Sequence, residues 1–426
     1  TYWIWVLIQL VISISIVAFI IPDAELKHLW KGEDRFLIVL GLIAVFAQNL
    51  VWTTALAMAE AQRQTIPAQK INTAVVLIHL CVVVLLWIFG KLAIPFLFIA
   101  IAVEWSLAGW FTSRLYSINK DVEEDESFLK ILSEYKIFCL PLIPYAWLGF
   151  IHNFADRWML QHWGGSEEQA YFSIARQFSI VTLLVATSIL NIFWKEISEA
   201  HYQANKEKVK NIFAKAHHLL YLFGVLVASF IFPWSKEILA LIVGREYIAG
   251  EITFMLMILY PVYQILGQIG GVMLLATHQT RLSTLIGGFA MILGLIVSYF
   301  MLAPPEAFIS GLGLASKGLA WKMLLVQFIQ INILYWFISR LFKVKFEWKF
   351  QIISLSVALG LSWTIKILIV NLLSIPIIFS VIIFGFLYLL LAITFLYFFP
   401  SIVGWERKEL NDFVSSVSRI TKIGDG

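Results

Sequence analysis

Apolar segments of about 20 residues recur along the whole chain of 426 residues, and they limit its fold more than any other feature. Each such segment is long enough to cross the hydrocarbon core of a bilayer as a helix. The segments are continuously apolar, whereas the strands of a membrane barrel alternate apolar and polar residues. The composition agrees, since 60% of the residues are hydrophobic and only 14% are charged. The sequence therefore predicts an all-α polytopic membrane protein.

Windows of about 20 apolar residues predict about twelve transmembrane helices. The third span is short, and the tenth is interrupted by Lys317 and Lys322. The predicted spans are residues 2–22, 36–59, 72–89, 92–116, 137–160, 169–194, 212–232, 251–276, 281–303, 316–341, 350–372 and 376–399.

Lysine and arginine are distributed unevenly between the two sets of loops, with twenty on one side and six on the other. The positive-inside rule places the richer set, which includes the C-terminal tail, in the cytoplasm. No loop exceeds about 25 residues, which leaves no room for an extramembrane catalytic domain. The sequence has no phosphate-binding loop and no nucleophile elbow. The small, dispersed net charge of +4 argues against nucleic-acid binding. We therefore expect a protein that is not an enzyme and has no cofactor or metal.

Two segments of the chain resemble each other and indicate an internal repeat. WFTSRLY at 110–116 and WFISRLF at 336–342 each end a predicted span on the cytoplasmic side. AEAQRQ at 59–64 and ATHQTR at 276–281 form a second pair at a similar offset. Chance is the alternative, because helices that end on the inner side favour aromatic residues followed by arginine. A true duplication pairs the first four spans with spans seven to ten.

The repeat predicts two six-helix lobes, of which the first lacks its first two helices. The chain opens at Thr1 directly into an apolar run, which agrees with a missing start. Two similar lobes with a cavity between them are a transporter architecture. We expect the rest of an N-terminal lobe at 1–136, a six-helix lobe at 137–349, an extra helix pair at 350–399 and a cytoplasmic tail at 400–426.

Seven ionisable residues lie inside predicted spans, where a charge is costly and usually functional. Five are basic and two are acidic, so a cavity that they share would be cationic and would suit an anionic substrate. They are Glu104, Asp156, Arg157, Arg176, Lys317, Lys322 and Lys366.

Arg176 is the strongest candidate for substrate binding, because its guanidinium matches phosphate oxygens with a bidentate fork. A buried ion pair with Asp156 is the alternative. Asp156 and Arg157 are adjacent and point about 100° apart on a helix. Asp156 shares a face with His152 and Asn153, which forms a polar stripe along the fifth span.

Pro141 and Pro144 predict a bend in this span that either gates a passage or is a static kink. Glu104 and Asp156 are candidates for binding a coupling ion, and Glu104 could instead pair with an arginine.

The remaining polar residues inside spans have two interpretations each. Amides contact the substrate or hold helices together, and those inside spans are Gln48, Asn49, Gln264, Gln268, Gln327, Gln330 and Asn332. Lys317 and Lys322 either line the cavity or extend outward to the interface. Lys366 is expected to face a lipid headgroup or a partner.

The segment ADRWMLQHWGGSEEQAYFSIARQFSI at 155–180 resembles the start of the second half of polysaccharide-biosynthesis flippases. LIVGREYIAG at 241–250, LLATHQTRLSTLIG at 274–287 and GLGLASKGLAWKMLLVQFIQINI at 311–333 continue the resemblance in the same order. This family belongs to the multidrug, oligosaccharidyl-lipid and polysaccharide exporter superfamily.

The resemblance implies two lobes with alternating access and a polyprenyl-diphosphate-linked oligosaccharide as the substrate. The oligosaccharide on such a lipid is an O-antigen, capsule or exopolysaccharide repeat unit, and it crosses the inner membrane of the cell. The resemblance assigns contact with the diphosphate or acidic sugars to Arg176, with Arg157 second. The implied partners are the lipid-linked oligosaccharide, membrane lipid, and a polysaccharide polymerase with its chain-length regulator.

Three alternatives stay open. The first two are an ion-coupled multidrug exporter and a peptidoglycan-precursor flippase of the same fold. The third is a membrane-embedded polysaccharide polymerase or acyltransferase, which a long outer loop or a paired acid and histidine would favour, and neither is evident in the sequence.

Overall fold

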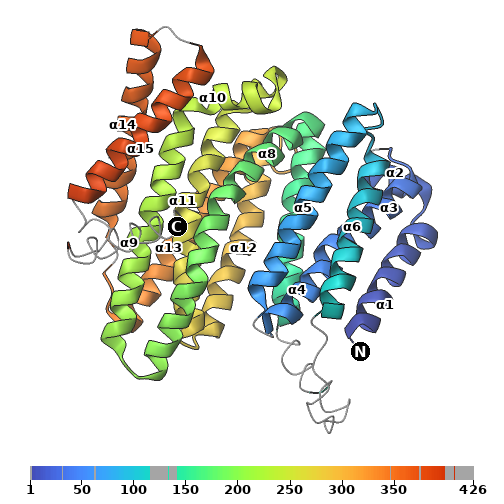
Figure 1. Cartoon of the computed structure of the whole chain (residues 1–426), viewed down its shortest axis with the longest axis horizontal. Coiled ribbons are helices and arrows are strands. Elements are labelled where there is room, and N and C mark those ends of the chain that lie inside the picture. The colour runs from blue at the N-terminus through green and yellow to red at the C-terminus, as the bar shows by residue number, and fades with distance from the viewer. Residues whose placement is uncertain are drawn as a thin grey trace, which may run out of the picture. The chain divides into compact units, whose positions relative to one another are not determined.

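The computed structural model describes residues 2–30, 32–61, 64–115, 133, 142–345, 347–373, 376–398 and 407. Within these ranges the chain is helical, with short connections and no strand (Figure 1). The prediction of an all-α fold is confirmed.

A helical segment occupies each of the twelve predicted spans. Nine helical segments of the described part are long and apolar enough to cross a membrane, while the helix at the N-terminus is shorter and α8 carries charges in both arms. The segments are α1 (Tyr2–Ser15) with η1 (Ile16–Ile20), α3 (Arg35–Phe46) with η2 (Ala47–Val51) and α4 (Trp52–Ala61), α5 (Thr65–Ile88), α6 (Ile94–Leu115), the two arms of α8 (Leu142–Tyr202), α9 (Lys206–Ile231), α11 (Glu251–Ala276), α12 (Thr280–Leu302), α13 (Ala315–Phe342), α14 (Trp348–Leu373) and α15 (Ile377–Phe398).

The chain forms two compact units, Thr1–Ser127 and Phe128–Gly426. Helices α1 to α6 belong to the first unit, and α8 to α15 belong to the second. The pair α14 and α15, expected as an addition to the second lobe, is part of the second unit. The predicted boundary between 136 and 137 and the predicted tail at 400–426, Arg407 apart, lie outside the described residues.

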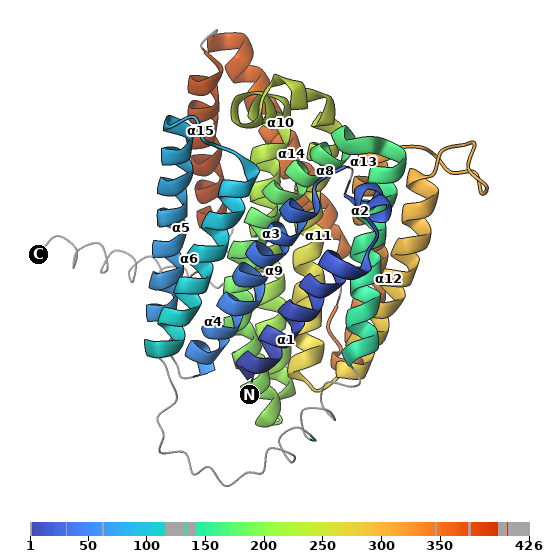
Figure 2. The ribbon, with the colours of Figure 1, turned by 90° about the vertical axis from the view of Figure 1, so that its right-hand side faces the viewer.

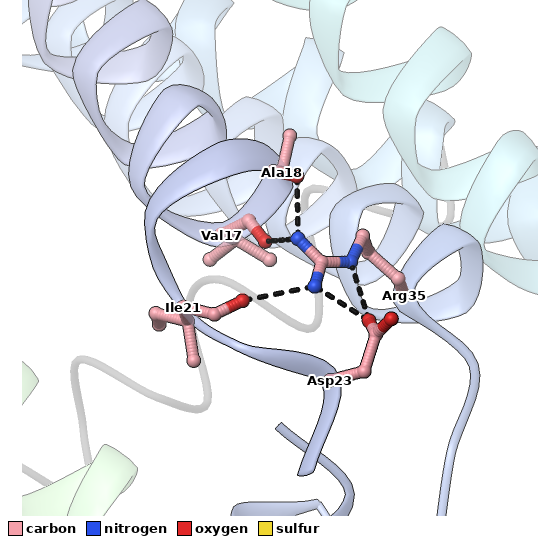
Figure 3. A network of polar contacts seen from close by, with 5 residues as sticks. All are labelled: Val17, Ala18, Ile21, Asp23 and Arg35. Atoms are coloured by element: carbon pink, nitrogen blue, oxygen red, sulfur yellow. Dashed lines mark hydrogen bonds and ion pairs between the residues drawn. The ribbon is translucent and has the colours of Figure 1, made fainter. Parts of the chain in front are cut away.

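In the first unit, Arg35 ties the start of α3 to the end of the first helix. Its guanidinium donates hydrogen bonds to the backbone carbonyls of Val17, Ala18 and Ile21 (Figure 3). It also pairs with the Asp23 carboxylate at 2.5 Å, at the start of α2 (Asp23–Leu29). The last carbonyls of a helix lack partners within the helix and carry partial negative charge. One cation therefore satisfies this helix end and fixes the following turn.

The core of the first unit lies where α6 packs against α4, α5 and η2. The rings of Trp52 and Trp105 meet there at 5.5 Å between centroids. Ala47, Val75 and Ala108 complete this buried cluster. Aromatic and aliphatic side chains around α6 thus form a core of this unit.

In the second unit, α8 turns at Gly165, which divides it into two arms. Gly165 has a φ of 82°, a backbone conformation that a residue without a Cβ adopts at no steric cost. Three residues later, the Glu168 carboxylate accepts a hydrogen bond of 3.0 Å from the backbone N–H of Ser316. A carboxylate is favourable at a helix N-terminus, here that of α13. The turn between the arms is thereby attached to the first turn of α13.

Helices α8, α9, α11, α12 and α13 run alongside one another in both views of the second unit (Figures 1 and 2). Helix α11 is the most central, because it packs against α8, α9 and α13. Its side chains Met257, Val262, Ile265 and Leu266 are fully buried. This packing places the polar side chains of α8, α11, α12 and α13 around a common space.

Helix α14 is attached to this bundle through Lys366. The Lys366 ammonium lies 2.7 Å from the Glu237 carboxylate and 2.7 Å from the carbonyl of Pro233. It also lies 4.7 Å from the ring centroid of Trp234. The expectation that Lys366 faces a lipid headgroup or a partner is wrong, because its ammonium pairs with Glu237 in α10 (Ser235–Ile238). The sequence alone does not show that these two residues lie close together.

The stretch 235–247, between α9 and α11, forms short helical pieces. After α10 come η4 (Leu239–Val243) and η5 (Arg245–Gly250), and Figure 1 shows α10 crossing one end of the unit.

The two similar segments of the sequence adopt the same local arrangement. The Arg114 guanidinium lies 5.1 Å from the ring centroid of Trp110 in the last turns of α6. The Arg340 guanidinium lies 4.1 Å from that of Trp336 in the last turns of α13. In each case the aromatic ring lies four residues before the arginine, so both side chains project from one face of the helix.

Candidate functional site

A polar cavity of about 370 Å³ lies in the second unit between both arms of α8, α11, α12 and α13. Its charged lining residues are three bases and one acid: Arg157, Arg176, Lys322 and Asp156. His152, two tyrosines and five amide side chains add further hydrogen-bonding groups. The cavity is therefore cationic and polar, in a unit whose helices are otherwise mostly apolar.

Lys322 on α13 is the centre of a buried network. Its side chain is 1% exposed, and its ammonium lies 2.6 Å from the Asp156 carboxylate and 2.9 Å from His152 Nε2. A lysine ammonium has only donors, so His152 Nε2 acts as the acceptor. Ser298 on α12 donates a hydrogen bond of 2.5 Å to the other Asp156 oxygen. The network thus joins α8, α12 and α13 and satisfies both oxygens of the acid.

This network decides two questions that the sequence left open. Lys322 does not extend outward to the interface, because it is buried against Asp156. Asp156 in turn pairs with Lys322 and not with Arg176. A buried charge is tolerated when it has an opposite charge and hydrogen bonds, and this lysine meets both conditions.

The sequence permits the network through two local features. His152 and Asp156 lie four residues apart on α8 and therefore share one face of the helix. Gly294 on α12 lies against them, and a Cβ there would stand 2.6 Å from His152 Nε2 and 3.1 Å from Lys322 Cε. Only glycine allows α12 to approach this closely without displacing the network.

Arg157 and Arg176 line the same cavity but have no partner in it. Among the described residues, neither guanidinium makes a hydrogen bond or an ion pair. Arg176 is half-buried on the second arm of α8, and Arg157 is exposed on the first arm. Each offers five N–H donors with a fixed positive charge, which suits an anionic ligand.

Amide side chains form most of the remaining polar wall. Gln268 on α11 has a buried carbonyl oxygen that finds no hydrogen-bond partner in the described part of the chain. Gln264, one turn earlier, accepts a hydrogen bond of 2.9 Å from the Tyr260 hydroxyl. Asn153 donates to the carbonyl of Gly149 at 2.8 Å. Gln327 and Gln330 line the cavity from α13. Such groups can bind a ligand that is rich in hydroxyls.

The candidates from the sequence are placed as follows. Arg176, Arg157, Asp156, Asn153, Gln268 and Gln327 all line the cavity. Lys317 does not, because it is exposed elsewhere on α13. Glu104 belongs to the other unit.

Of the two prolines singled out for gating, the structure describes one, and it lies in the first turn of α8. Pro144 is the third described residue of α8, and Pro141 lies outside the described residues. The proline inside α11, Pro261, was not singled out. It lies next to the cavity residue Tyr260, where an interior proline removes a backbone hydrogen bond and bends a helix.

Tyr145 and Tyr260 were also missed, although the sequence carries a signal for each. Tyr145 lies seven residues before His152, which extends the polar stripe of α8 by two turns. Tyr260, Gln264 and Gln268 recur every four residues and form a second stripe on α11.

In the first unit, Glu104 on α6 pairs with His79 on α5. His79 Nδ1 lies 2.7 Å from Glu104 Oε2, and the two side chains are 30% and 10% exposed. Glu104 Oε1 is buried without a hydrogen-bond partner among the described residues. The partner that the sequence suggested for this acid was an arginine, whereas the structure provides a histidine.

Comparisons with known proteins agree with this fold. The MatE family model matches residues 141–300 of the chain. This range contains the described part of α8, all of α9 and α11, and most of α12. No curated protein matches the chain in sequence.

Three solved structures are similar along most of the chain. The first is the lipid II flippase MurJ in an inward closed conformation, with 11% identity, coverage of 94% of this chain and 82% of that one, and a TM-score of 0.67. The second is a multidrug resistance MATE family transporter in an outward-facing conformation, with 12% identity, coverage of 79% and 78%, and a TM-score of 0.58. The third is a variant of the Vibrio cholerae MATE transporter VcmN, with 12% identity, coverage of 79% and 76%, and a TM-score of 0.56. The chain therefore has the fold of these transporters.

Proposed function

We propose that this protein is a transporter that moves a polyprenyl-diphosphate-linked oligosaccharide from the inner to the outer leaflet of the cell membrane. The observation that carries the proposal is the pair of unpartnered arginines, Arg157 and Arg176, in the cavity of the second unit. A charge that faces a cavity in a membrane protein without a counter-ion is costly unless a ligand supplies one. A diphosphate supplies that charge and accepts bidentate hydrogen bonds.

The rest of the lining supports a saccharide attached to the phosphate. Gln264, Gln268, Gln327 and Gln330 offer both donors and acceptors, as the hydroxyls of a sugar require. The buried carbonyl oxygen of Gln268 still lacks a donor, and a sugar hydroxyl would supply one. The charged headgroup would thus be held in a polar cavity while the prenyl chain stays in the lipid.

The similar structures include transporters of two different classes of substrate. One of them is a flippase of lipid II, whereas the others are multidrug transporters. A cationic drug would meet three bases and one acid in this cavity, and the acid is already bound to Lys322. The charge of the cavity therefore favours an anionic lipid. A peptidoglycan precursor and an oligosaccharide of another kind share the anchor chemistry, and the leaflet assay below separates them.

The loop charges add an orientation to the proposal. We place the C-terminus in the cytoplasm of a cell whose inner membrane holds the protein. A polysaccharide polymerase and its chain-length regulator are the partners expected on the outer side, where they would use the translocated lipid.

The test is the distribution of the lipid-linked oligosaccharide between leaflets in cells depleted of the protein. An enzyme or lectin confined to the outer face detects the saccharide. We expect it to accumulate on the inner face and to return outward when the wild-type gene is expressed. Arg176→Ala should fail to restore it, whereas Arg281→Ala, an exposed arginine of α12 outside the cavity, should restore it fully.

Two results would contradict the proposal. If depletion leaves the oligosaccharide unchanged but moves the peptidoglycan precursor to the inner face, the substrate is that precursor. If depletion changes only the export of cationic drugs, the protein is a multidrug exporter.

A further inference from the structure

We propose that His79 and Glu104 form a proton-binding site in the first unit, which takes up and releases one proton during the transport cycle. The existence of the site stands on its own, and only its part in the cycle rests on the proposed function.

The pair lies deep within two membrane-spanning helices. Both α5 and α6 are long and apolar enough to cross a membrane, over Ile66–Ile88 and Ile94–Leu115. Glu104 is ten residues from one end of its span and eleven from the other, so about 15 Å of helix separates it from each end. His79 lies thirteen and nine residues from the ends of its own span. An acid and a histidine at this depth are rarely present without a function.

The contact between the two side chains requires a proton. His79 Nδ1 and Glu104 Oε2 are 2.7 Å apart, a distance at which one proton lies between a ring nitrogen and a carboxyl oxygen. The second carboxyl oxygen, Oε1, is buried and unpartnered in the described part of the chain. An ionised carboxylate with one bare oxygen is strongly disfavoured away from water, so the site has a position that a further proton can occupy.

The proton count of the site is simple. With a neutral imidazole and a carboxylate, the pair carries one negative charge. Binding one proton from water makes the pair neutral, either as an imidazolium beside a carboxylate or as an imidazole beside a carboxylic acid. Releasing that proton to water restores the negative charge. No oxidant, reductant or other reactant takes part.

The other charged groups around the pair are remote from it or already paired. The elements packed against α6 are α3, η2, α4 and α5. Lys70 lies nine residues from His79 on α5, about 13 Å along the helix, and Arg114 lies ten residues from Glu104 on α6, about 15 Å. The Arg114 guanidinium covers Trp110, and Arg35 on α3 is held by Asp23.

The remaining titratable groups of these elements are the exposed Cys81 on α5 and Glu60 at the end of α4, and η2 has none. None of the described hydrogen bonds or ion pairs joins these groups to His79 or Glu104. The pair is thus bound to no fixed positive charge, and its own proton can balance the carboxylate.

The second unit offers a matched control. Glu237 also has one oxygen at 2.7 Å from its partner and one buried oxygen without a partner in the described residues. Its partner, however, is the ammonium of Lys366 and not an imidazole. Replacing Glu237 should therefore leave the proton site of His79 and Glu104 unchanged.

The direct test is infrared difference spectroscopy of the full-length protein in liposomes, recorded between about pH 5 and pH 8, where histidine and perturbed carboxyl groups titrate. We expect a buried carboxylic-acid band in the wild type and in Glu237→Gln, and its loss in Glu104→Gln. His79→Gln keeps a hydrogen-bond donor and should shift the titration of the band. An unchanged band in Glu104→Gln would overturn the proposal. This measurement needs no substrate.

The role in the cycle is tested by transport into the same liposomes with and without a pH gradient. Glu104→Gln should still exchange the lipid-linked oligosaccharide between leaflets but should lose the acceleration that a gradient gives the wild type. A variant that still responds to the gradient contradicts this role. If the wild type moves no lipid-linked oligosaccharide at all, the proposed function fails, while the infrared result still decides the proton site.

Discussion

Asp156 in the second unit and Glu104 in the first are largely buried acids of helices α8 and α6, and their surroundings differ. Asp156 in the second unit has hydrogen bonds on both oxygens, and its charge is balanced by Lys322. Glu104 in the first unit has a bond on one oxygen only, and its partner is His79. The first acid meets a buried ammonium, and the second meets an imidazole.

This difference separates two tasks that one membrane protein must perform. A fully satisfied acid and base form a constant scaffold, and the scaffold leaves Arg157 and Arg176 free to bind an anion. A half-satisfied acid beside a histidine can change its charge. The comparison implies that substrate binding belongs to the second unit and proton binding to the first. The four predictions that follow test this division, from the largest expected effect to the smallest.

Replacing the buried acid by its amide should lower the free energy of unfolding far more for Asp156 in the second unit than for Glu104 in the first. Asp156→Asn leaves the buried ammonium of Lys322 without a counter-charge, which costs about 3–5 kcal/mol. Glu104→Gln replaces one charged hydrogen-bond acceptor by a neutral one, about 1 kcal/mol, because the glutamine oxygen can still accept from His79. Thermal unfolding of the purified protein in detergent measures both losses. The double variant Asp156→Leu with Lys322→Met should recover most of the stability. Equal losses of stability in Asp156→Asn and Glu104→Gln would contradict the difference between the two units.

Arg176→Ala should reduce transport of the lipid-linked oligosaccharide roughly tenfold to a hundredfold without lowering stability. The estimate follows from the loss of charge-assisted hydrogen bonds to a phosphate, about 1.5–3 kcal/mol. Arg176→Lys should retain part of the activity, because it keeps the charge but loses the bidentate fork. Transport is measured in liposomes and stability by thermal unfolding. Wild-type transport by the alanine variant would remove Arg176 from the mechanism.

Gln268→Leu should reduce transport severalfold and leave stability unchanged or slightly higher. The reason is that its buried carbonyl oxygen has no partner in the described residues, so leucine removes a desolvation cost of about 1–3 kcal/mol. Gln264→Leu is the matched control, since it breaks the bond with Tyr260 and should lower stability. A clear loss of stability in Gln268→Leu would mean that this amide holds helices together.

Lys317→Ala should change neither transport nor stability, with any change in the free energy of unfolding within about 0.5 kcal/mol. Lys317 is exposed and does not line the cavity, although it lies only five residues from Lys322 on α13. Parallel transport and unfolding measurements on Lys322→Ala supply the contrast. A large effect of Lys317→Ala would extend the site beyond the cavity described here.

The sequence predicted the helical spans well, because each span must be apolar along about 20 residues wherever it lies in the fold. It also predicted that His152, Asn153 and Asp156 share a face, because helical spacing is a local property.

The sequence could not predict which side chains far apart in the chain form ion pairs. Lys322 meets Asp156 across 166 residues, and Lys366 meets Glu237 across 129. Nothing local distinguishes Lys322, which is buried, from Lys317, which is exposed. His79 was passed over because a lone histidine in an apolar span carries no signal until its neighbour is known.

One measurement tests the division of tasks most directly: the rate at which purified protein in liposomes moves a lipid-linked oligosaccharide between leaflets, with and without a pH gradient. The account predicts that Arg176→Ala is roughly tenfold to a hundredfold slower than the wild type in both conditions. It predicts that Glu104→Gln is active in both and indifferent to the gradient. Transport by Arg176→Ala at the wild-type rate, or a preserved gradient response in Glu104→Gln, would contradict it.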